Sequence, residues 1–221
     1  MAEIPQTITL AMMRESFYSA VVSDVLDSAG YRNQCIATPL LPATGVHKLV
    51  GRCKTTQWED VDFEDPKPYE LELKAIDECQ ADDILVAAAN GSMRSGIWGE
   101  LLSTASKNAG CVGAIIDGAI RDIAPMREMG FGVFALGACP YDSLHRQRVT
   151  AVDVAVEIGG VTFNPGDLVI ADDDGIVVVP QAVESDVVRG AWEKVHAENE
   201  VRDSIRNGMS ATAVFEKYGI L

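Results

Sequence analysis

Three polar side chains in the middle of the 221-residue chain, Glu100, Arg121 and Asp122, are of types that act on carbonyl compounds. The guanidinium of Arg121 is a planar fork that can hold a carboxylate through two hydrogen bonds. Asp122 supplies the hard oxygen ligand that Mg²⁺ and Mn²⁺ prefer, and Glu100 is a candidate base or a group that orders water. Together they suit a reaction that stabilises an enolate next to a carbonyl carbon.

Backbone donors add to this candidate site. Gly99 and Glu100 open a predicted helix, whose first amides, those of Leu101 and Leu102, have no acceptor within the helix. The N-terminal end of a helix favours anions. We therefore expect a carboxylate or an enolate oxygen to bind at this end of the helix.

Structural roles for the same residues stay open. An Arg-Asp pair after a strand often forms a salt bridge within a loop, and Asp122 stands where it would cap the next helix. Glu100 also fits the common preference for an acid in the first turn of a helix. Residue types and spacing alone leave both the catalytic and the structural interpretation open.

Other motifs in the chain are weaker signals. Three consecutive acids, Asp172 to Asp174, resemble a metal cluster, but they stand before Gly175 between apolar runs, which favours a hairpin turn. The sequence has neither a GxSxG nucleophile elbow nor a phosphate-binding P-loop. The histidines lack the spacing of metal ligands, and they are His47, His145 and His196.

Charge and composition exclude several classes of protein. The formal net charge is −15, from 33 acidic and 18 basic residues, whereas nonspecific nucleic-acid binding needs clustered Lys and Arg. Five scattered cysteines without CxxC spacing indicate reduced thiols. We find neither a signal peptide nor an apolar run long enough to span a membrane. We therefore expect a cytoplasmic protein that binds neither nucleic acid nor membrane.

Alternating strands and helices predict an α/β fold with a parallel core sheet. Apolar runs at 84–89 and 112–116 are expected as buried strands, each ending in polar residues. Because ligands bind at the carboxyl ends of parallel strands, we expect the turns after these two strands to share one cleft. The other expected elements of this part are helices at 9–29, 71–79, 100–108 and 122–129, strands at 49–57 and 131–136, and a loop at 90–99.

After residue 150 the pattern changes to a β-rich layer. Three or four short strands are separated by glycine-bearing turns, and a charged helix follows over 182–207. We expect one domain over residues 1–221. It would carry an N-terminal helical arm over 1–30 and C-terminal helices over 182–221, which are too polar for a core and are available for subunit contacts.

Three segments of the chain resemble the RraA-like family. They are SAVVSDVLDSAG, SGIWGELLSTASKNAGCVGAIIDGAIRDIAPMREMGFGVFALGACP and NPGDLVIADDDGIVVVP. That family includes 4-hydroxy-4-methyl-2-oxoglutarate/4-carboxy-4-hydroxy-2-oxoadipate aldolases and the regulator of ribonuclease activity A. Its aldolase members share an acid, a gap of twenty residues and then Arg-Asp. Here Glu100 is followed by the same gap and by Arg121 and Asp122, although the family's acid is usually Asp.

The resemblance implies a role for each of these residues. Asp122 would bind Mg²⁺ or Mn²⁺, partly through waters, and Arg121 would bind the pyruvyl part of the substrate. A glutamate from the C-terminal helix of a neighbouring subunit would complete the site, and Glu198 matches it best, with Glu193 and Glu200 close by. Backbone amides would also bind the pyruvyl part, those of Gly99, Glu100, Leu101 and Leu102.

The fold and assembly implied by the resemblance are a three-layer arrangement of the swivelling-domain kind, forming trimers or hexamers of two trimers. The site would lie at the subunit interface. The implied reaction is retro-aldol cleavage of a 4-hydroxy-2-oxo acid to pyruvate, with oxaloacetate decarboxylation as a side activity. Two alternatives stay open: a regulator without chemistry that binds RNase E, and a lyase with the same metal-enolate site but another oxo or hydroxy acid as substrate.

Overall fold

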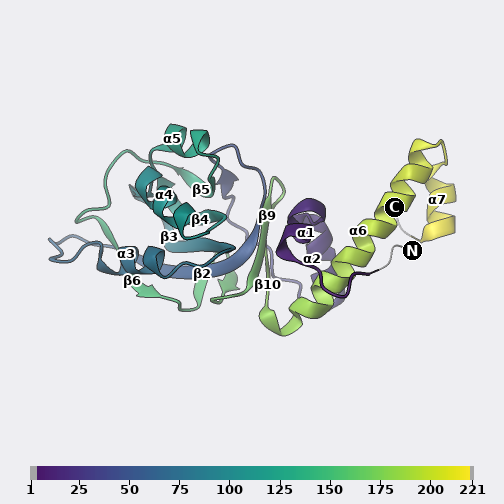
Figure 1. Ribbon diagram of the computed structural model, residues 1–221, viewed down its shortest axis with the longest axis horizontal. Coiled ribbons are helices and arrows are strands. Elements are labelled where there is room, and N and C mark those ends of the chain that lie inside the picture. Colours follow the sequence, from purple (N-terminus) through teal and green to yellow (C-terminus); the bar gives the residue numbers. More distant parts are fainter. Residues whose placement is uncertain (1–3, 220–221) are drawn as a thin grey trace.

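An eight-stranded sheet forms the centre of the fold within residues 4–219, the part of the chain that the computed structural model describes (Figure 1). Its strands stand in the order β1-β5-β4-β3-β2-β9-β10, and β6 pairs with β2. The strands from β2 to β5 are parallel, whereas the pairings of β1, β6, β9 and β10 are antiparallel. The strands are β1 (Leu41–Pro42), β2 (Leu49–Asp60), β3 (Asp83–Trp98), β4 (Gly113–Ile120), β5 (Gly132–Ala138), β6 (Gln147–Val152), β9 (Leu168–Asp172) and β10 (Gly175–Val179).

Alternation along the strands gives the sheet two apolar faces, because successive side chains of a strand point to opposite sides. On β3, Leu85 and Ala87 lie in the buried cluster covered by α3, α4 and α5. Ile84 and Val86 lie in the cluster that packs against the β7–β8 hairpin. The covering elements are α3 (Glu70–Asp77), α4 (Glu100–Asn108), α5 (Ile123–Glu128), β7 (Val156–Ile158) and β8 (Val161–Phe163).

Helix α2 packs on β9 and β10, α1 contacts β2, and α6 packs on α2, on the side of β9 and β10 where Figure 1 shows these helices. Phe17 and Leu26 are fully buried in a cluster that they share with Leu168 and Val177. The expectation that the terminal helices are too polar for a core is therefore wrong for these faces, while subunit contacts by their outer faces stay a prediction. The terminal helices are α1 (Leu10–Ser16), α2 (Ser19–Ser28), the 3₁₀ helix η1 (Gln181–Val183), α6 (Glu184–Arg206) and α7 (Ala211–Tyr218).

The single helix predicted over 9–29 is in fact two helices. The backbone is extended at Phe17 and Tyr18, and α2 begins at Ser19. The backbone N–H and the hydroxyl of Ser19 each donate to the Asp172 carboxylate at 2.6 Å. A carboxylate at a helix N-terminus accepts from donors that lack helical partners. This contact comes from a distant part of the chain and starts a new helix within the predicted one.

The loop predicted over 90–99 is also wrong, because β3 continues through nearly all of it. Asn90 and Gly91 adopt left-handed conformations, with φ of 52° and 71°, and the register between β3 and β4 shifts three times. The two strands nevertheless stay paired as far as Trp98 and Ile120. The irregular segment is therefore a bulged part of a strand. Its glycines led to the prediction of a loop.

The predicted class is confirmed in its main features: an α/β fold with a parallel core, a β-rich C-terminal layer and flanking terminal helices. The helix predicted over 100–108 coincides with α4, and Asp174-Gly175 lies at the turn of the β9–β10 hairpin. None of the described helices has the length and apolarity to cross a membrane. The single domain over 1–221 stays a prediction, and residues 1–3 and 220–221 of it lie outside the described residues.

Candidate functional site

The end of the β3–β4 pairing brings the sequence-predicted residues together. Trp98 pairs with Ile120, and the carbonyl of Trp98 accepts a hydrogen bond from the Arg121 N–H at 2.8 Å. Helix α4 starts immediately afterwards at Glu100, with Gly99 as its N-cap residue. The helix N-terminus and the Arg-Asp pair are therefore neighbours in space although twenty residues separate Glu100 from Arg121.

Of the two polar turns that we expected to share a cleft, the one after β4 lines the cleft through Arg121 and Asp122, whereas Asn90, Gly91 and Ser92 are not among its described lining residues. The buried carboxylate of Asp117 accepts the N–H of Gly91 at 3.1 Å, which satisfies a donor of the irregular part of β3. Burial raises the pKa of Asp117, and backbone hydrogen bonds from Gly91 and Asn90 oppose the shift. The cleft lies further along both strands, where Gly96, Ile97 and Arg121 line it.

Asp122 faces helix α4 rather than capping α5. Its backbone is left-handed, with φ of 56°, and within the described residues its side chain makes no capping hydrogen bond to α5. Its Oδ2 instead accepts the N–H of Glu100 at 3.3 Å. A Cβ at Gly99 would lie 2.6 Å from the same oxygen, so this approach requires glycine. Asp122 therefore stands at the N-cap position of α5 as expected, but its side chain does not cap that helix.

Arg121 is held mainly by a residue that we did not predict, Asp142. The Arg121 guanidinium lies 2.8 Å from Asp142 Oδ2 and 3.8 Å from Asp122 Oδ2. Asp142 Oδ1 accepts from the Tyr69 hydroxyl at 2.9 Å and from the N–H of Leu144 at 2.7 Å. Burial alone would raise the pKa of Asp142, but these hydrogen bonds and the charge of Arg121 together lower it. Asp142 is thus an anion that orients Arg121.

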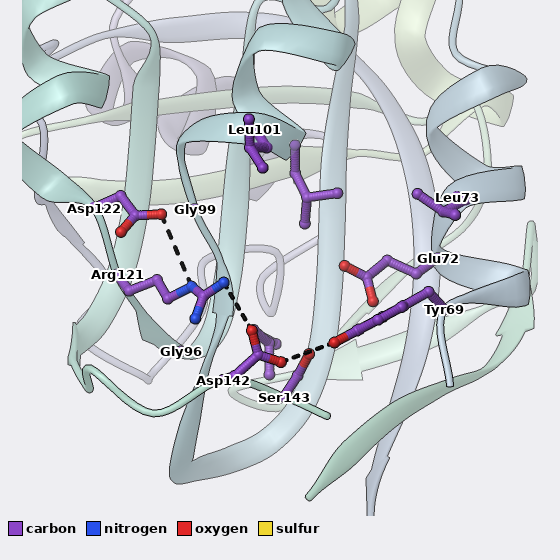
Figure 2. A pocket seen from close by; sticks show the side chains of 12 residues that line it. Tyr69, Glu72, Leu73, Gly96, Gly99, Leu101, Arg121, Asp122, Asp142 and Ser143 are labelled. Atoms are coloured by element: carbon purple, nitrogen blue, oxygen red, sulfur yellow. Dashed lines mark hydrogen bonds and ion pairs between the residues drawn. The ribbon is translucent and has the colours of Figure 1, made fainter. Parts of the chain in front are cut away.

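These side chains line a cavity of about 300 Å³, which Figure 2 shows with Arg121 on one side and Glu72 on the other. Leu101, at the rim, is 78% exposed. The carboxylate of Glu100 is not among the described groups that line the cavity, and its Oε1 accepts from the Thr104 hydroxyl at 2.7 Å. The lining residues are Tyr69, Glu72, Leu73, Gly96, Ile97, Gly99, Leu101, Leu102, Arg121, Asp122, Asp142 and Ser143.

Glu72 is the second residue that sequence reasoning missed. It is 7% exposed, and its Oε2 has no hydrogen-bond partner among residues 4–219. Burial, and next the negative charge of Asp142, raise the pKa of Glu72 to about 8, against the opposing effect of Arg121. A signal for it exists, since Glu72 shares the buried face of α3 with Ala75 and Ile76. Acidic side chains are rarely buried, so an acid on the apolar face of a helix indicates a functional or paired group.

Glu198 lies away from this cavity in its own chain. It is on α6, which extends away from the sheet (Figure 1), and it accepts a hydrogen bond from the Tyr18 hydroxyl. Arg202 lies 3.9 Å from its carboxylate. Desolvation and this carboxylate raise the pKa of Tyr18 to about 12. The entry of Glu198 into a neighbouring subunit's site stays a prediction.

The run of acids at 172–174 has structural contacts. Asp172 binds the N-terminus of α2, its Oδ1 also accepts the N–H of Asp174 at 3.1 Å, and Asp173 lies 2.6 Å from the His47 ring. In the described part of the chain, no group of three or more His, Cys, Asp or Glu side chains is arranged to hold a metal ion. A metal at the cavity would therefore rest on Asp122, as in sites where Mg²⁺ keeps most of its waters.

Comparison with known proteins identifies the family. The family model described as RraA-like, Aldolase/RraA, matches residues 19–178. The chain belongs to this family. The match spans the whole sheet except the end of β10 and includes every element that lines the cavity. The predicted RraA-like fold is thereby confirmed.

Relatives in the RraA-like family carry names of different kinds. A Halalkalibacterium halodurans protein named "Putative 4-hydroxy-4-methyl-2-oxoglutarate aldolase" is 31% identical over 198 residues, covering 89% of each chain. Protein DlpA of Legionella pneumophila is 26% identical over 205 residues, and the match covers 90% of this chain and 32% of DlpA. The chain thus spans about a third of the length of DlpA.

A solved structure extends the comparison to a regulator. Streptomyces coelicolor RraAS2, described as an unusual member of the RNase ES inhibitor RraA protein family, is 32% identical, with a TM-score of 0.76. The similarity covers 91% of this chain and 98% of that one. The family therefore includes both a protein named as an aldolase and a protein named with RNase inhibitors.

Proposed function

We propose that the chain is a divalent-metal-dependent lyase, which cleaves a 4-hydroxy-2-oxo acid by a retro-aldol reaction and releases pyruvate. The observation that carries the proposal is the convergence of Arg121, Asp122 and the N-terminus of α4 on one cavity. The name of the Halalkalibacterium halodurans relative supports the same reaction class. Oxaloacetate decarboxylation, which passes through the same pyruvate enolate, is a natural side activity.

The residues of the cavity divide the chemistry between them. Arg121 uses the guanidinium donors not taken by Asp142 to hold the oxo-acid end. The amides of Leu101 and Leu102, in the first turn of α4, add donors for the developing negative charge. Loss of the 4-hydroxyl proton turns C4 into the carbonyl carbon of an aldehyde or ketone and breaks the C3–C4 bond. The electrons of that bond leave on the pyruvyl part as an enolate, and a proton returned to C3 completes pyruvate.

A carboxylate accepts the hydroxyl proton through a water molecule in this proposal. The Glu100 carboxylate sits at the same helix end but hydrogen-bonds Thr104, so it would act through an ordered water. Glu198 of a neighbouring subunit is the second carboxylate that we assign to the site. This assignment requires a homotrimer, or a hexamer of two trimers, with the cavity at the subunit interface.

A divalent ion fits the donors present. Asp122 offers a half-exposed carboxylate at the cavity wall, held by the Glu100 amide, and Mg²⁺ or Mn²⁺ with several waters needs no more than one or two carboxylates. When bound, such an ion supplies Lewis-acid polarisation of the oxo acid. Asp122 would hold it, and Gly99 leaves the space for that carboxylate.

A panel of 4-hydroxy-2-oxo acids tests the lyase directly. We expect pyruvate release with Mg²⁺ or Mn²⁺, measured by coupling to lactate dehydrogenase, and its loss with EDTA and in Asp122→Ala. Oxaloacetate joins the panel as the decarboxylation substrate. Pyruvate formation no higher than in Asp122→Ala for every member of the panel would disprove the lyase.

Gly99→Ala is expected to weaken Mn²⁺ binding by roughly 10- to 100-fold, a usual effect of disturbing the groups that orient a metal ligand. The new methyl would lie 2.6 Å from Asp122 Oδ2 and push the carboxylate from the Glu100 amide. Titration calorimetry with Mn²⁺ measures the change. Gly137→Ala is the matched control, since its methyl meets only the flexible end of Met93 at 3.0 Å. Equal affinities of the two variants would contradict the assigned role of Asp122.

A regulator of an RNase is the second candidate function, favoured by the RraAS2 relative and by the net charge of −15, which suits binding to basic protein segments. A pull-down with the C-terminal segment of RNase E at moderate salt distinguishes the regulator from the lyase. Binding by the wild-type chain, retained in Asp122→Ala, supports the regulator. Absence of binding at that salt counts against it.

A further inference from the structure

The wall of the cavity opposite Arg121 is built around an acid that no part of the proposed reaction uses. Figure 2 shows the Glu72 carboxyl pointing from α3 into the cavity, beside Tyr69. The residue is only 7% exposed, and its Oε2 lacks a hydrogen-bond partner among the described residues. A buried polar atom left unpaired costs free energy. A ligand in the cavity that carries a hydrogen-bonding group would supply the missing partner of Oε2.

The charges around Glu72 define what that ligand carries. Among the described residues that line the cavity, Arg121 is the single cation, and Asp142 already pairs with it at 2.8 Å. The Tyr69 hydroxyl donates its hydrogen to Asp142, so this hydroxyl is left as an acceptor. A carboxylate at the Glu72 end would therefore face the anionic Asp142 with no free cation to balance it, which is unfavourable in a partly desolvated site.

We propose that Glu72 selects substrates whose end remote from the oxo acid carries an uncharged hydroxyl group rather than a second carboxylate. The ligand class is the 4-hydroxy-2-oxo monocarboxylic acids with a further hydroxyl on the tail. The substrate hydroxyl would pair with Oε2 of Glu72, while Arg121 holds the single carboxylate. This inference rests on the proposed lyase function and names the substrate class of the same cavity.

The protonation state of Glu72 supports this choice. Burial raises the pKa of Glu72 to about 8, so its carboxyl is mostly protonated at neutral pH and both donates and accepts hydrogen bonds. A hydroxyl group also does both, so the two groups are complementary. Loss of one such buried hydrogen bond commonly lowers binding by roughly 10- to 100-fold.

Three substrates that differ only in the tail test the inference. They are 4,5-dihydroxy-2-oxopentanoate, 4-hydroxy-2-oxopentanoate and 4-hydroxy-2-oxoglutarate, with a hydroxyl, a methyl and a carboxylate at the tail. We expect the wild-type kcat/KM for the first to exceed that for the third by at least roughly tenfold. Glu72→Leu is expected to reduce the advantage of the hydroxyl over the methyl to about twofold or less, because it removes the partner of the hydroxyl.

Two further variants sharpen the test. Glu72→Lys supplies the missing cation and is expected to shift the preference toward 4-hydroxy-2-oxoglutarate. Glu70→Gln is the matched control: Glu70 is on the same helix but is exposed and pairs with Lys67 at 2.6 Å, so its loss should leave the substrate ratios unchanged.

Failure of the inference and failure of the lyase give different results. A wild-type preference for 4-hydroxy-2-oxoglutarate, or unchanged ratios in Glu72→Leu, overturns the role of Glu72 while the lyase stands. Pyruvate from none of the three substrates overturns the lyase itself. The wild-type ratio decides the question even if the Glu72 variants fold poorly, because it needs no substitution.

Discussion

Arg121→Ala is expected to lower kcat/KM for pyruvate release by roughly 10²- to 10³-fold, the usual effect of removing one donor that stabilises a developing oxyanion. The guanidinium is the single cation among the described residues that line the cavity, and Asp142 orients it at 2.8 Å. Without it, the described residues that line the cavity offer the substrate carboxylate no cationic side chain. Steady-state kinetics with the preferred oxo acid measures the loss.

Two companion variants separate the charge of Arg121 from its geometry. Arg121→Lys keeps the positive charge but loses the planar fork, so we expect it to recover only part of the activity. Asp142→Asn keeps the hydrogen bond but removes the negative partner, and a smaller loss is expected because Arg121 then holds its position less firmly. Activity of Arg121→Ala within threefold of the wild type would show that the cavity binds its anion elsewhere.

Glu72→Gln is expected to raise the free energy of unfolding by about 3 kcal/mol at pH 7. Burial raises the pKa of Glu72 from 4.5 to about 8. Between these values the folded chain keeps a proton that the unfolded chain has released, so this group lowers stability progressively as pH rises from 4.5 to 8. Glutamine resembles the protonated acid but does not ionise, so the stability of the variant does not fall in this way as pH rises.

Urea unfolding at pH 4.5 and at pH 8 tests this prediction. The advantage of Glu72→Gln should be small at the lower pH and largest at the higher one, and any constant cost of the amide cancels in the comparison. Glu70→Gln serves again as the control, because Glu70 is exposed. A difference between Glu72→Gln and the wild type that does not change with pH would contradict the raised pKa of Glu72.

Local sequence patterns predicted part of the cavity wall, namely the first turn of α4 and the Arg121-Asp122 pair. The apolar residues of α4, with glycines on both sides, placed its start at Glu100, and the Arg-Asp pair after an apolar strand marked the second part of the site. Each of these patterns involves only a few neighbouring residues, so it can be recognised in the sequence without knowledge of the fold. The contacts of Glu100 were less predictable, since its carboxylate faces Thr104 and its amide faces Asp122.

Residues from distant segments escaped prediction. Asp142 follows β5 and Tyr69 precedes α3, and nothing in their neighbourhoods indicates that Tyr69 binds Asp142 or that Asp142 pairs with Arg121. Glu72 carried a detectable signal, an acid on the buried face of a helix, but a helical pattern does not say what that face covers. The wall of the cavity opposite Arg121, which Glu72 and Tyr69 form, is therefore the part that the sequence predicts least.

By itself, the sequence determined the class of fold, the bounds of α4 and the placing of Arg121 and Asp122 beside its first turn, since periodicity and helix boundaries depend on neighbouring residues. Only the tertiary structure decided the register that pairs Trp98 with Ile120, the break before Ser19 and the meeting of Glu72 with Asp142. These features depend on strand register and on contacts between remote segments, whose free energies no local pattern records.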